Sequence, residues 1–149
     1  MAVERDNKNP YAAFNFVVEI DGEQIAAFQE VSGLDSENTP IEYREGADAM
    51  NTVRKLPGIE KYPNLTLKRG ITGSLALWEW RKQARDGAGA FPPIRNVTVT
   101  LQNDVHDGVM KWTLTNAWCS KLTGPTLNAT GNEIAVETME LAYDRLDIE

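Results

Sequence analysis

The stretch Phe14-Asn-Phe16-Val-Val18-Glu-Ile20-Asp21-Gly22 contains the pattern that decides the fold. Its apolar side chains recur at every second position, which is the period of a β-strand with one buried face. The Asp21-Gly22 pair that follows tolerates the positive φ angles of a tight hairpin turn. The stretch therefore predicts a half-buried strand that ends in a turn, with a returning strand over residues 24–31.

The same two-residue period recurs along most of the chain. It predicts further strands that begin near residues 40, 65, 97, 109 and 133. In the last of these segments the apolar parity shifts midway, and either a β-bulge or burial on both faces would explain the shift. About seven strands in a chain of this length predict a mainly β protein, with two packed antiparallel sheets that close into a small barrel or sandwich.

One segment, residues 74–86, is typical of an α-helix. Ser74 is a favourable N-cap residue, and the apolar residues that follow it, including Trp78 and Trp80, recur at helical spacing. Gly87 is expected to end this helix because glycine adopts the left-handed conformation of a C-cap. We expect both tryptophans to pack against a sheet within a single domain that spans residues 1–149.

The segment between residues 45 and 62 is expected to be a long inter-strand loop. Loops longer than about 12–15 residues in compact domains are usually functional. This one mixes charged with apolar residues, and exposed apolar side chains indicate a surface that another protein covers. The candidate assembly interface consists of Glu45, Gly46, Asp48, Met50, Arg54, Lys55, Leu56, Ile59 and Lys61.

Composition excludes several classes of function. The 149 residues include 15 Lys and Arg against 22 Asp and Glu, for a net charge of −7. Because non-specific nucleic-acid binding needs a basic surface, this balance argues against that role. The single cysteine, Cys119, is expected to be a buried or half-buried thiol on the strand face opposite Trp118. No catalytic, metal or cofactor site is predicted, and we expect the protein not to be an enzyme.

Asp104, His106 and Asp107 form the one cluster with the composition of a metal site. No second histidine or further cysteine completes a zinc site, and the spacing is not that of a calcium loop. The same residues suit the turn of a hairpin, because Asp and Gly tolerate tight turn positions. We therefore predict a turn, and keep metal-dependent hydrolysis as a remote alternative.

The sequence also bears on where the protein is made. The first ten residues are polar and do not resemble a signal peptide. The longest apolar runs are a few residues, whereas a membrane-spanning helix needs about 20. We expect synthesis and folding in a reducing cytoplasm, with no membrane span.

Several segments together resemble the inner tube protein of contractile tails, which includes phage tail tubes, extracellular contractile injection systems and, more distantly, the tube of type VI secretion. The resemblance extends over about residues 11–143. In the first part of the chain its segments are Tyr11-x-x-Phe14-x-Phe16-x-Val18-x-Ile20, Val31-Ser32-Gly33-Leu34, Tyr43-x-Glu45-Gly46, Lys55-Leu-Pro-Gly58, Lys61-Tyr62, Leu65-x-Leu67-Lys68-Arg69-Gly70, Leu77 and Trp80. In the second part they are Trp112, Ala117-Trp118, Gly124-Pro125, Leu127-Asn128-Ala129 and Asn132-Glu133-Ile134-Ala135-Val136-Glu137.

This resemblance implies a structural role. Six copies would form a ring, and rings would stack head to tail into a hollow conduit for protein effectors, or for DNA in a phage. The implied partners are further copies of the chain, a contractile sheath, a baseplate initiator, a terminal cap, and luminal cargo or a tape-measure protein. The implied location is a phage tail or a released injection particle.

A second reading stays open from the residues themselves. The tryptophan-rich face and the Phe91-Pro92-Pro93 loop could form the ligand site of a standalone β-barrel binding module. The self-assembly of the chain distinguishes the two readings, because a tube subunit must form rings or tubes whereas a binding module need not.

Overall fold

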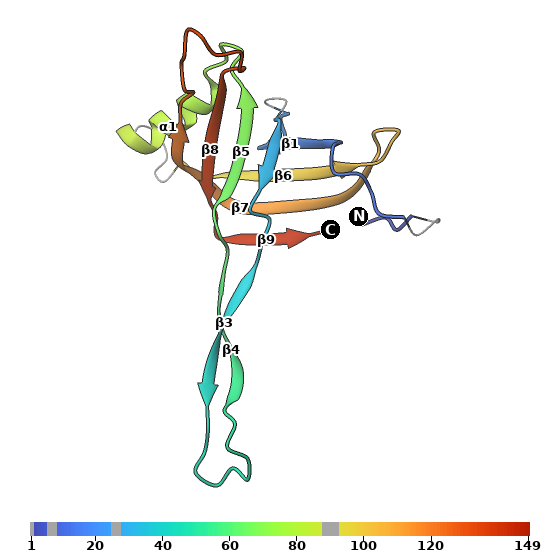
Figure 1. The fold of residues 1–149 in the computed structure, drawn as a ribbon, viewed down its shortest axis with the longest axis vertical. Coiled ribbons are helices and arrows are strands. Elements are labelled where there is room, and N and C mark those ends of the chain that lie inside the picture. The colour runs from blue at the N-terminus through green and yellow to red at the C-terminus, as the bar shows by residue number, and fades with distance from the viewer. Residues whose placement is uncertain (1, 6–8, 25–27, 88–92) are drawn as a thin grey trace.

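The computed structural model describes residues 2–5, 9–24, 28–87 and 93–149. It has nine strands and one helix in these parts of the chain (Figure 1). They are β1 (Phe16–Ile20), β2 (Glu30–Ser32), β3 (Glu37–Tyr43), β4 (Arg54–Lys61), β5 (Leu65–Gly70), α1 (Ala76–Asp86), β6 (Arg95–Gln102), β7 (Gly108–Thr123), β8 (Val136–Ala142) and β9 (Arg145–Ile148). The prediction of a mainly β protein with one helix is confirmed.

The long strand β7 links two antiparallel layers. Its first half pairs with β6 and β9, and β6 also pairs with β1. Its second half pairs with β8, which continues to β5 and β2. The strands of the second layer run across those of the first (Figure 1). The described strands form a sandwich of layers with free edges, so the expected closure into a barrel is not found.

A bulge at Asn116 lets β7 pass from one layer to the other. Between Arg95↔Ala117 and Val97↔Leu114 the register shifts by one residue, and Asn116 has a φ of 56°. One extra residue moves the following side chains to the opposite face. Ala117 and Cys119 are therefore buried while Trp118, on the opposite face of the strand, is exposed.

Alternating apolar residues of both layers form the core. Each is less than 4% exposed, and the helix adds two of them. The core residues are Val18, Ile20, Leu65, Leu67, Leu77, Trp80, Val97, Val99, Leu114, Ala117, Cys119, Met139 and Leu141. The alternation read from the sequence of β1, β5 and β6 is thus the alternation of burial.

The helix begins two residues later than expected. Leu75 occupies the N-cap position with no side-chain hydrogen bond, so Ser74 does not cap the helix. Instead the Ser74 carbonyl accepts a hydrogen bond of 3.0 Å from Arg69, a 3% exposed side chain that also pairs with Glu137. The predicted stop at Gly87 is confirmed, because Gly87 adopts the left-handed conformation.

The two helix tryptophans have different environments. Trp80 is fully buried, and its Nε1 donates a hydrogen bond of 2.8 Å to the Pro93 carbonyl. Trp78 is 41% exposed, and the Arg85 guanidinium lies 5.3 Å from the centroid of its ring. The expectation that both would pack in the core is therefore correct for Trp80 alone.

Two predicted strands differ from those observed. The turn at Asp21-Gly22 is present, with φ angles of 52° and 82°. However, the returning chain crosses to the other layer, where β2 pairs with β5, and part of its predicted range, residues 25–27, lies outside the described residues. The final segment divides into β8 and β9, which both pair with β7. Ile134 precedes β8 and is 82% exposed, and β8 pairs with β5 in a regular register, so no bulge in β8 produces the shift in apolar parity.

No helix in the described part of the chain combines the length and apolar character that crossing a membrane requires.

Candidate assembly interface

The expected loop over residues 45–62 is in large part a strand. β3 and β4 form a two-stranded antiparallel ribbon that projects from the body of the molecule (Figure 1). The sequence of β4, Arg-Lys-Leu-Pro-Gly-Ile-Glu-Lys, has no alternation of apolar and polar residues, and Pro57 and Gly58 disfavour a strand, so no sequence pattern indicates it. We call residues 37–61 the arm. It contains every residue of the candidate assembly interface.

The arm has two chemically different faces. Ile41 lies opposite Leu56, and Tyr43 lies opposite Arg54, so that these four side chains share one face. The pair Glu42↔Lys55 lies on the other face. We call the first the apolar face of the arm. Further large apolar side chains of the arm are also exposed, among them Met50 at 69% and Ile59 at 80%.

Hydrogen bonds within the arm order its tip. Asp48 Oδ1 is 2.6 Å from Arg54 Nη2, and Asp48 Oδ2 accepts a hydrogen bond of 3.0 Å from the Glu45 amide. The Tyr43 hydroxyl donates to Glu45 Oε1 at 2.9 Å, and this bond raises the pKa of Tyr43. Asp48, Arg54 and Glu45 thus shape the tip within one chain.

Gly58 marks an irregularity in the ribbon. The register shifts between Asn38 and Pro40, and a Cβ on Gly58 would lie 2.2 Å from the Thr39 carbonyl oxygen. Only glycine allows this close approach of the two backbones. The bulge leaves Ile59 exposed at the base of the arm.

Aromatic packing fixes the base of the arm to the body. The Tyr62 and Tyr143 rings lie with their centroids 5.7 Å apart. The Tyr143 hydroxyl donates to the Gly33 carbonyl at 3.4 Å, and burial of this side chain raises its pKa. Both connections of the arm to the body, before β3 and after β4, are therefore held at one place.

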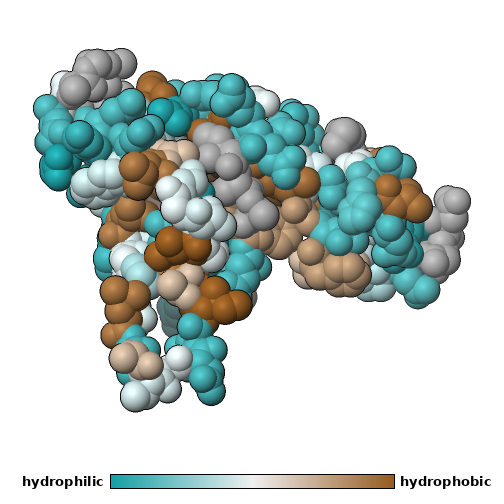
Figure 2. Space-filling view, turned by 90° about the horizontal axis from the view of Figure 1, so that it is seen from above, coloured by the Kyte–Doolittle hydropathy of each residue, from teal (hydrophilic) through white to brown (hydrophobic). Residues whose placement is uncertain are grey.

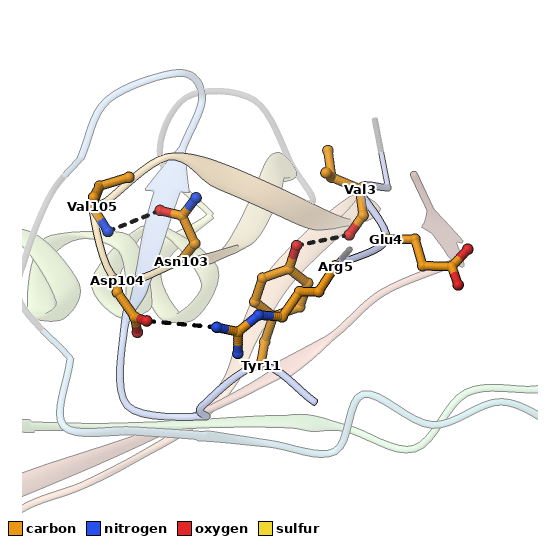
Figure 3. Close-up of a pocket in the computed structure, with 7 residues that line it drawn as sticks. All are labelled: Val3, Glu4, Arg5, Tyr11, Asn103, Asp104 and Val105. Atoms are coloured by element: carbon orange, nitrogen blue, oxygen red, sulfur yellow. Dashed lines mark hydrogen bonds and ion pairs between the residues drawn. The ribbon is translucent and has the colours of Figure 1, made fainter. Parts of the chain in front are cut away.

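A second surface lies where the N-terminal segment meets the β6–β7 turn (Figure 3). The Arg5 guanidinium lies 5.0 Å from the Tyr11 ring centroid and 3.7 Å from Asp104 Oδ2. The Tyr11 hydroxyl donates to the Val3 carbonyl at 3.0 Å, and the Val3 amide donates to Val109 at 2.7 Å. No local pattern in the sequence indicates this contact.

The cluster around His106 is a turn, as predicted. The Asn103 side chain accepts hydrogen bonds from the Val105 and Asp107 amides at 3.0 and 2.9 Å, and His106 has a φ of 65°. These hydrogen bonds and this φ angle are typical of a tight turn that a side chain stabilises. In the described residues, no group of three or more His, Cys, Asp or Glu side chains is placed to hold a metal ion.

Two further features were singled out from the sequence, the single cysteine and the Phe91-Pro92-Pro93 loop. Cys119 is fully buried, as expected, and burial raises the pKa of its thiol to about 11. Phe91 and Pro92 of the alternative ligand site lie outside the described residues. Pro93, the described residue of that loop, accepts a hydrogen bond at its carbonyl from the core residue Trp80.

Comparison with known proteins identifies the family. Residues 12–147 match the T4-like virus tail tube protein gp19 family. The chain belongs to this tail tube family. A tail tube protein is a structural component of a phage tail or of a tail-like injection particle, and the tube role is therefore that of this chain. A comparison with curated protein sequences gave no match.

Solved structures agree with the tail tube family. A chain from an extracellular contractile injection system, the PVC sheath–tube complex in its extended state, is 32% identical, with a TM-score of 0.80 over 94% of this chain and 91% of that one. A chain from the anti-feeding prophage cap, the AFP tube terminating cap, is 32% identical, with a TM-score of 0.81 over 100% and 94%. Hcp1 from Flavobacterium johnsoniae is 15% identical, with a TM-score of 0.62 over 89% and 93%, and shares the fold.

Proposed function

We propose that copies of this chain assemble through the arm into six-membered rings, which stack into the inner tube of a contractile injection particle. The observation that carries this proposal is the exposed apolar face of the arm. An isolated two-stranded hairpin is marginally stable in water, and three or more strands or packing against another element are needed. A second protein surface that covers Ile41 and Leu56 would meet this need.

The arrangement of surfaces suits head-to-tail assembly. The arm projects from one side of the body, and a contact between unlike surfaces of identical subunits closes into a ring or repeats along a filament. The charges of the arm, such as Lys55 and Lys61, would set the register between copies. In this role the residues Glu45, Asp48 and Arg54 act indirectly, because they shape the tip that makes the contact.

The cargo of the tube is proposed to be protein. The similarity at 32% identity to chains of extracellular injection systems supports an injection particle over a phage tail. Charge points the same way, since six copies of a chain with a net charge of −7 would carry about −42, and such a wall repels DNA. A phage tail tube that passes DNA is the second candidate, which membership of the gp19 family favours.

The partners and location follow from this role. A contractile sheath and a terminating cap are proposed on the similarity to chains from a sheath–tube complex and a tube cap. A baseplate initiator and luminal cargo complete the expected set. We propose that the chain is made in the cytoplasm, is incorporated there into the particle, and performs no catalysis.

Electron microscopy and sedimentation velocity of the chain, co-expressed with its neighbouring genes, test the proposal. We expect sixfold rings or stacked tubes. Monomers alone would contradict it. The gene neighbourhood separates the two candidates, because capsid and terminase genes indicate a phage, whereas a sheath gene with an AAA-type ATPase and no capsid indicates an injection system.

A further inference from the structure

The arm is joined to the body at one narrow place. Every residue of β3 and β4 except Gly58 is exposed, and among the described strands these two pair only with each other. The chain enters the arm after Gly33 and leaves it toward Asn64. Gly33 has a φ of 92°, and a Cβ at this position would clash with the Asn64 carbonyl oxygen, so the two connections touch here. Only glycine allows the backbones to approach so closely.

Tyr143 is the residue of the body that contacts both connections. Its hydroxyl donates a hydrogen bond of 3.4 Å to the Gly33 carbonyl on the incoming connection. The centroid of its ring lies 5.7 Å from that of Tyr62 on the outgoing connection, and the two rings are tilted by 39°. A hydrogen bond of 3.4 Å is long and therefore weak, whereas tilted rings at this separation attract each other. The contact between the rings is thus the stronger of the two.

The corner that carries Tyr143 is hydrogen-bonded to β7. Tyr143 lies between β8 and β9, and the next amide, that of Asp144, donates to the Thr115 carbonyl at 3.0 Å. Asp144 Oδ2 accepts a hydrogen bond of 3.0 Å from the side chain of Asn116, the residue at the bulge of β7. Because β7 links the two layers, Tyr143 relates the direction of the arm to the whole body.

A small error in direction at this place becomes a large displacement at the far end of the arm. At about 3.3 Å per residue, the eight residues of β4 span about 26 Å, so a tilt of about 10° moves the far end by about 4 Å. Neighbouring strands of a sheet are about 4.7 Å apart, so this displacement is close to the width of one strand. The arm must therefore hold its direction to meet a specific surface.

Exposed apolar side chains do not by themselves determine which surface the arm meets. Phe14, Leu75 and Ile134, from the segments before β1, α1 and β8, are 73%, 61% and 82% exposed. Seen from above, apolar side chains are exposed among the polar ones on the body (Figure 2). Several surfaces of a neighbouring copy thus offer apolar side chains to the apolar face of the arm, and the direction of the arm selects among them.

We infer that Tyr143 is a positioning residue, which through Tyr62 and Gly33 fixes the direction of the arm and so selects the surface of the neighbouring copy that the arm reaches. The inference rests on the proposed assembly through the arm and adds the residue that orients it. An arm held in one direction before assembly loses less conformational entropy on binding than a mobile arm does. Loss of the contact between the two rings should therefore loosen the arm and lower the yield of tubes.

Distances between two spin labels test this role in the unassembled chain. Labels on Glu42→Cys in the arm and Lys121→Cys in β7 report the direction of the arm by double electron–electron resonance. Both positions are exposed, and the native Cys119 is buried. We expect Tyr143→Leu to widen the distance distribution at least about twofold, because leucine does not replace the attraction between the rings. Tyr143→Phe keeps the ring and should retain the narrow distribution.

A second variant keeps the test independent of folding. Tyr143 also packs against the core, so circular dichroism checks whether Tyr143→Leu is folded. Tyr62→Leu removes the same contact between the rings from the side of the arm, and we expect it to widen the distribution equally. Both leucine variants should give at least about fivefold fewer tubes than the unchanged chain, because a mobile arm must be ordered on binding, whereas Tyr143→Phe should assemble normally.

The outcomes separate this inference from the proposed function. Unchanged distance distributions in Tyr62→Leu and in folded Tyr143→Leu would overturn the positioning role, and so would a normal yield of tubes from an arm that has become mobile. Both results leave the tube function standing when the unchanged chain forms tubes. An unchanged chain that never assembles would overturn the proposed function and the selection of a partner surface, whatever the distances show.

Discussion

Ile41 and Leu56 lie directly opposite each other in the arm, and each keeps about half of its side chain exposed, 53% and 47%. Cross-strand apolar pairs normally stabilise a sheet by burying each other against a third layer. In the described part of the chain, no third layer covers this pair. The proposed assembly through the arm would give these two side chains a partner surface.

Charged substitutions in the arm should block assembly and leave the body folded. With Met50→Glu and Leu56→Glu together, we expect tube yield to fall at least about tenfold, because a buried, unpaired carboxylate is costly at an interface. The far-ultraviolet circular dichroism spectrum should not change. Leu127→Glu, at a side chain that is 82% exposed outside the arm, is the control. Unchanged tube yield in the double variant would remove the assembly role of the arm.

Gly58→Ala should distort the arm. Its Cβ would lie 2.2 Å from the Thr39 carbonyl oxygen, so the two strands must separate. We expect faster tryptic cleavage at Arg54, Lys55 and Lys61, together with reduced tube formation. Gly46→Ala is the matched control, because a Cβ on Gly46 meets nothing within 4 Å. If both variants are cleaved at the same rate as the unchanged chain, the close approach at Gly58 does not hold the ribbon together.

The sequence predicted the body of the fold better than the arm. Uninterrupted alternation in β1, β5 and β6 matches their burial, because each of these strands has one face in the core. In the arm, Pro57 and Gly58 hide a strand whose residues contact no core at all. The candidate interface residues stay a prediction, which rests on apolar residues in a segment expected at the surface and does not depend on whether that segment is a loop or a strand.

Longer-range effects limited the prediction elsewhere. The bulge at Asn116 reverses the faces of Trp118 and Cys119, and it depends on hydrogen bonds to Asn96 and Asp144, both distant in sequence. Similarly, Ser74 has the chemistry of an N-cap, but its carbonyl is used by Arg69 and the helix begins later. The helix and strand propensities of individual residues carry no information about such tertiary contacts.

Removal of the buried cation Arg69 should destabilise the body. Arg69 is 3% exposed, pairs with Glu137 and donates to the Ser74 carbonyl. Breaking a buried pair typically costs about 3–5 kcal/mol, so we expect Arg69→Met to lower the free energy of unfolding in urea by that amount. Lys68→Met removes the exposed pair with Glu30 and should cost less than about 1 kcal/mol. Equal losses in the two variants would contradict the structural role of Arg69.

The Cys119 thiol should resist modification in the folded chain. Its pKa is raised to about 11 by burial, so the reactive thiolate is scarce at pH 8. We expect iodoacetamide to label it far more slowly than in urea. The pKa of this thiol is higher in the folded chain than in the unfolded chain, so burial of the protonated thiol favours the folded state. This contribution to the free energy of unfolding is complete below the unfolded pKa and is lost as the pH rises toward 11. Cys119→Ala should lack this alkaline loss, and rapid labelling of the native thiol would contradict its burial.

The most direct test of the central claim is a cryo-electron microscopy reconstruction of particles formed when the chain is co-expressed with its sheath and baseplate genes. We predict a hollow tube of stacked six-membered rings inside the sheath, with each arm covered by a neighbouring copy. Particles that assemble without this chain in the tube, or a tube in which residues 37–61 contact no other subunit, would contradict the account.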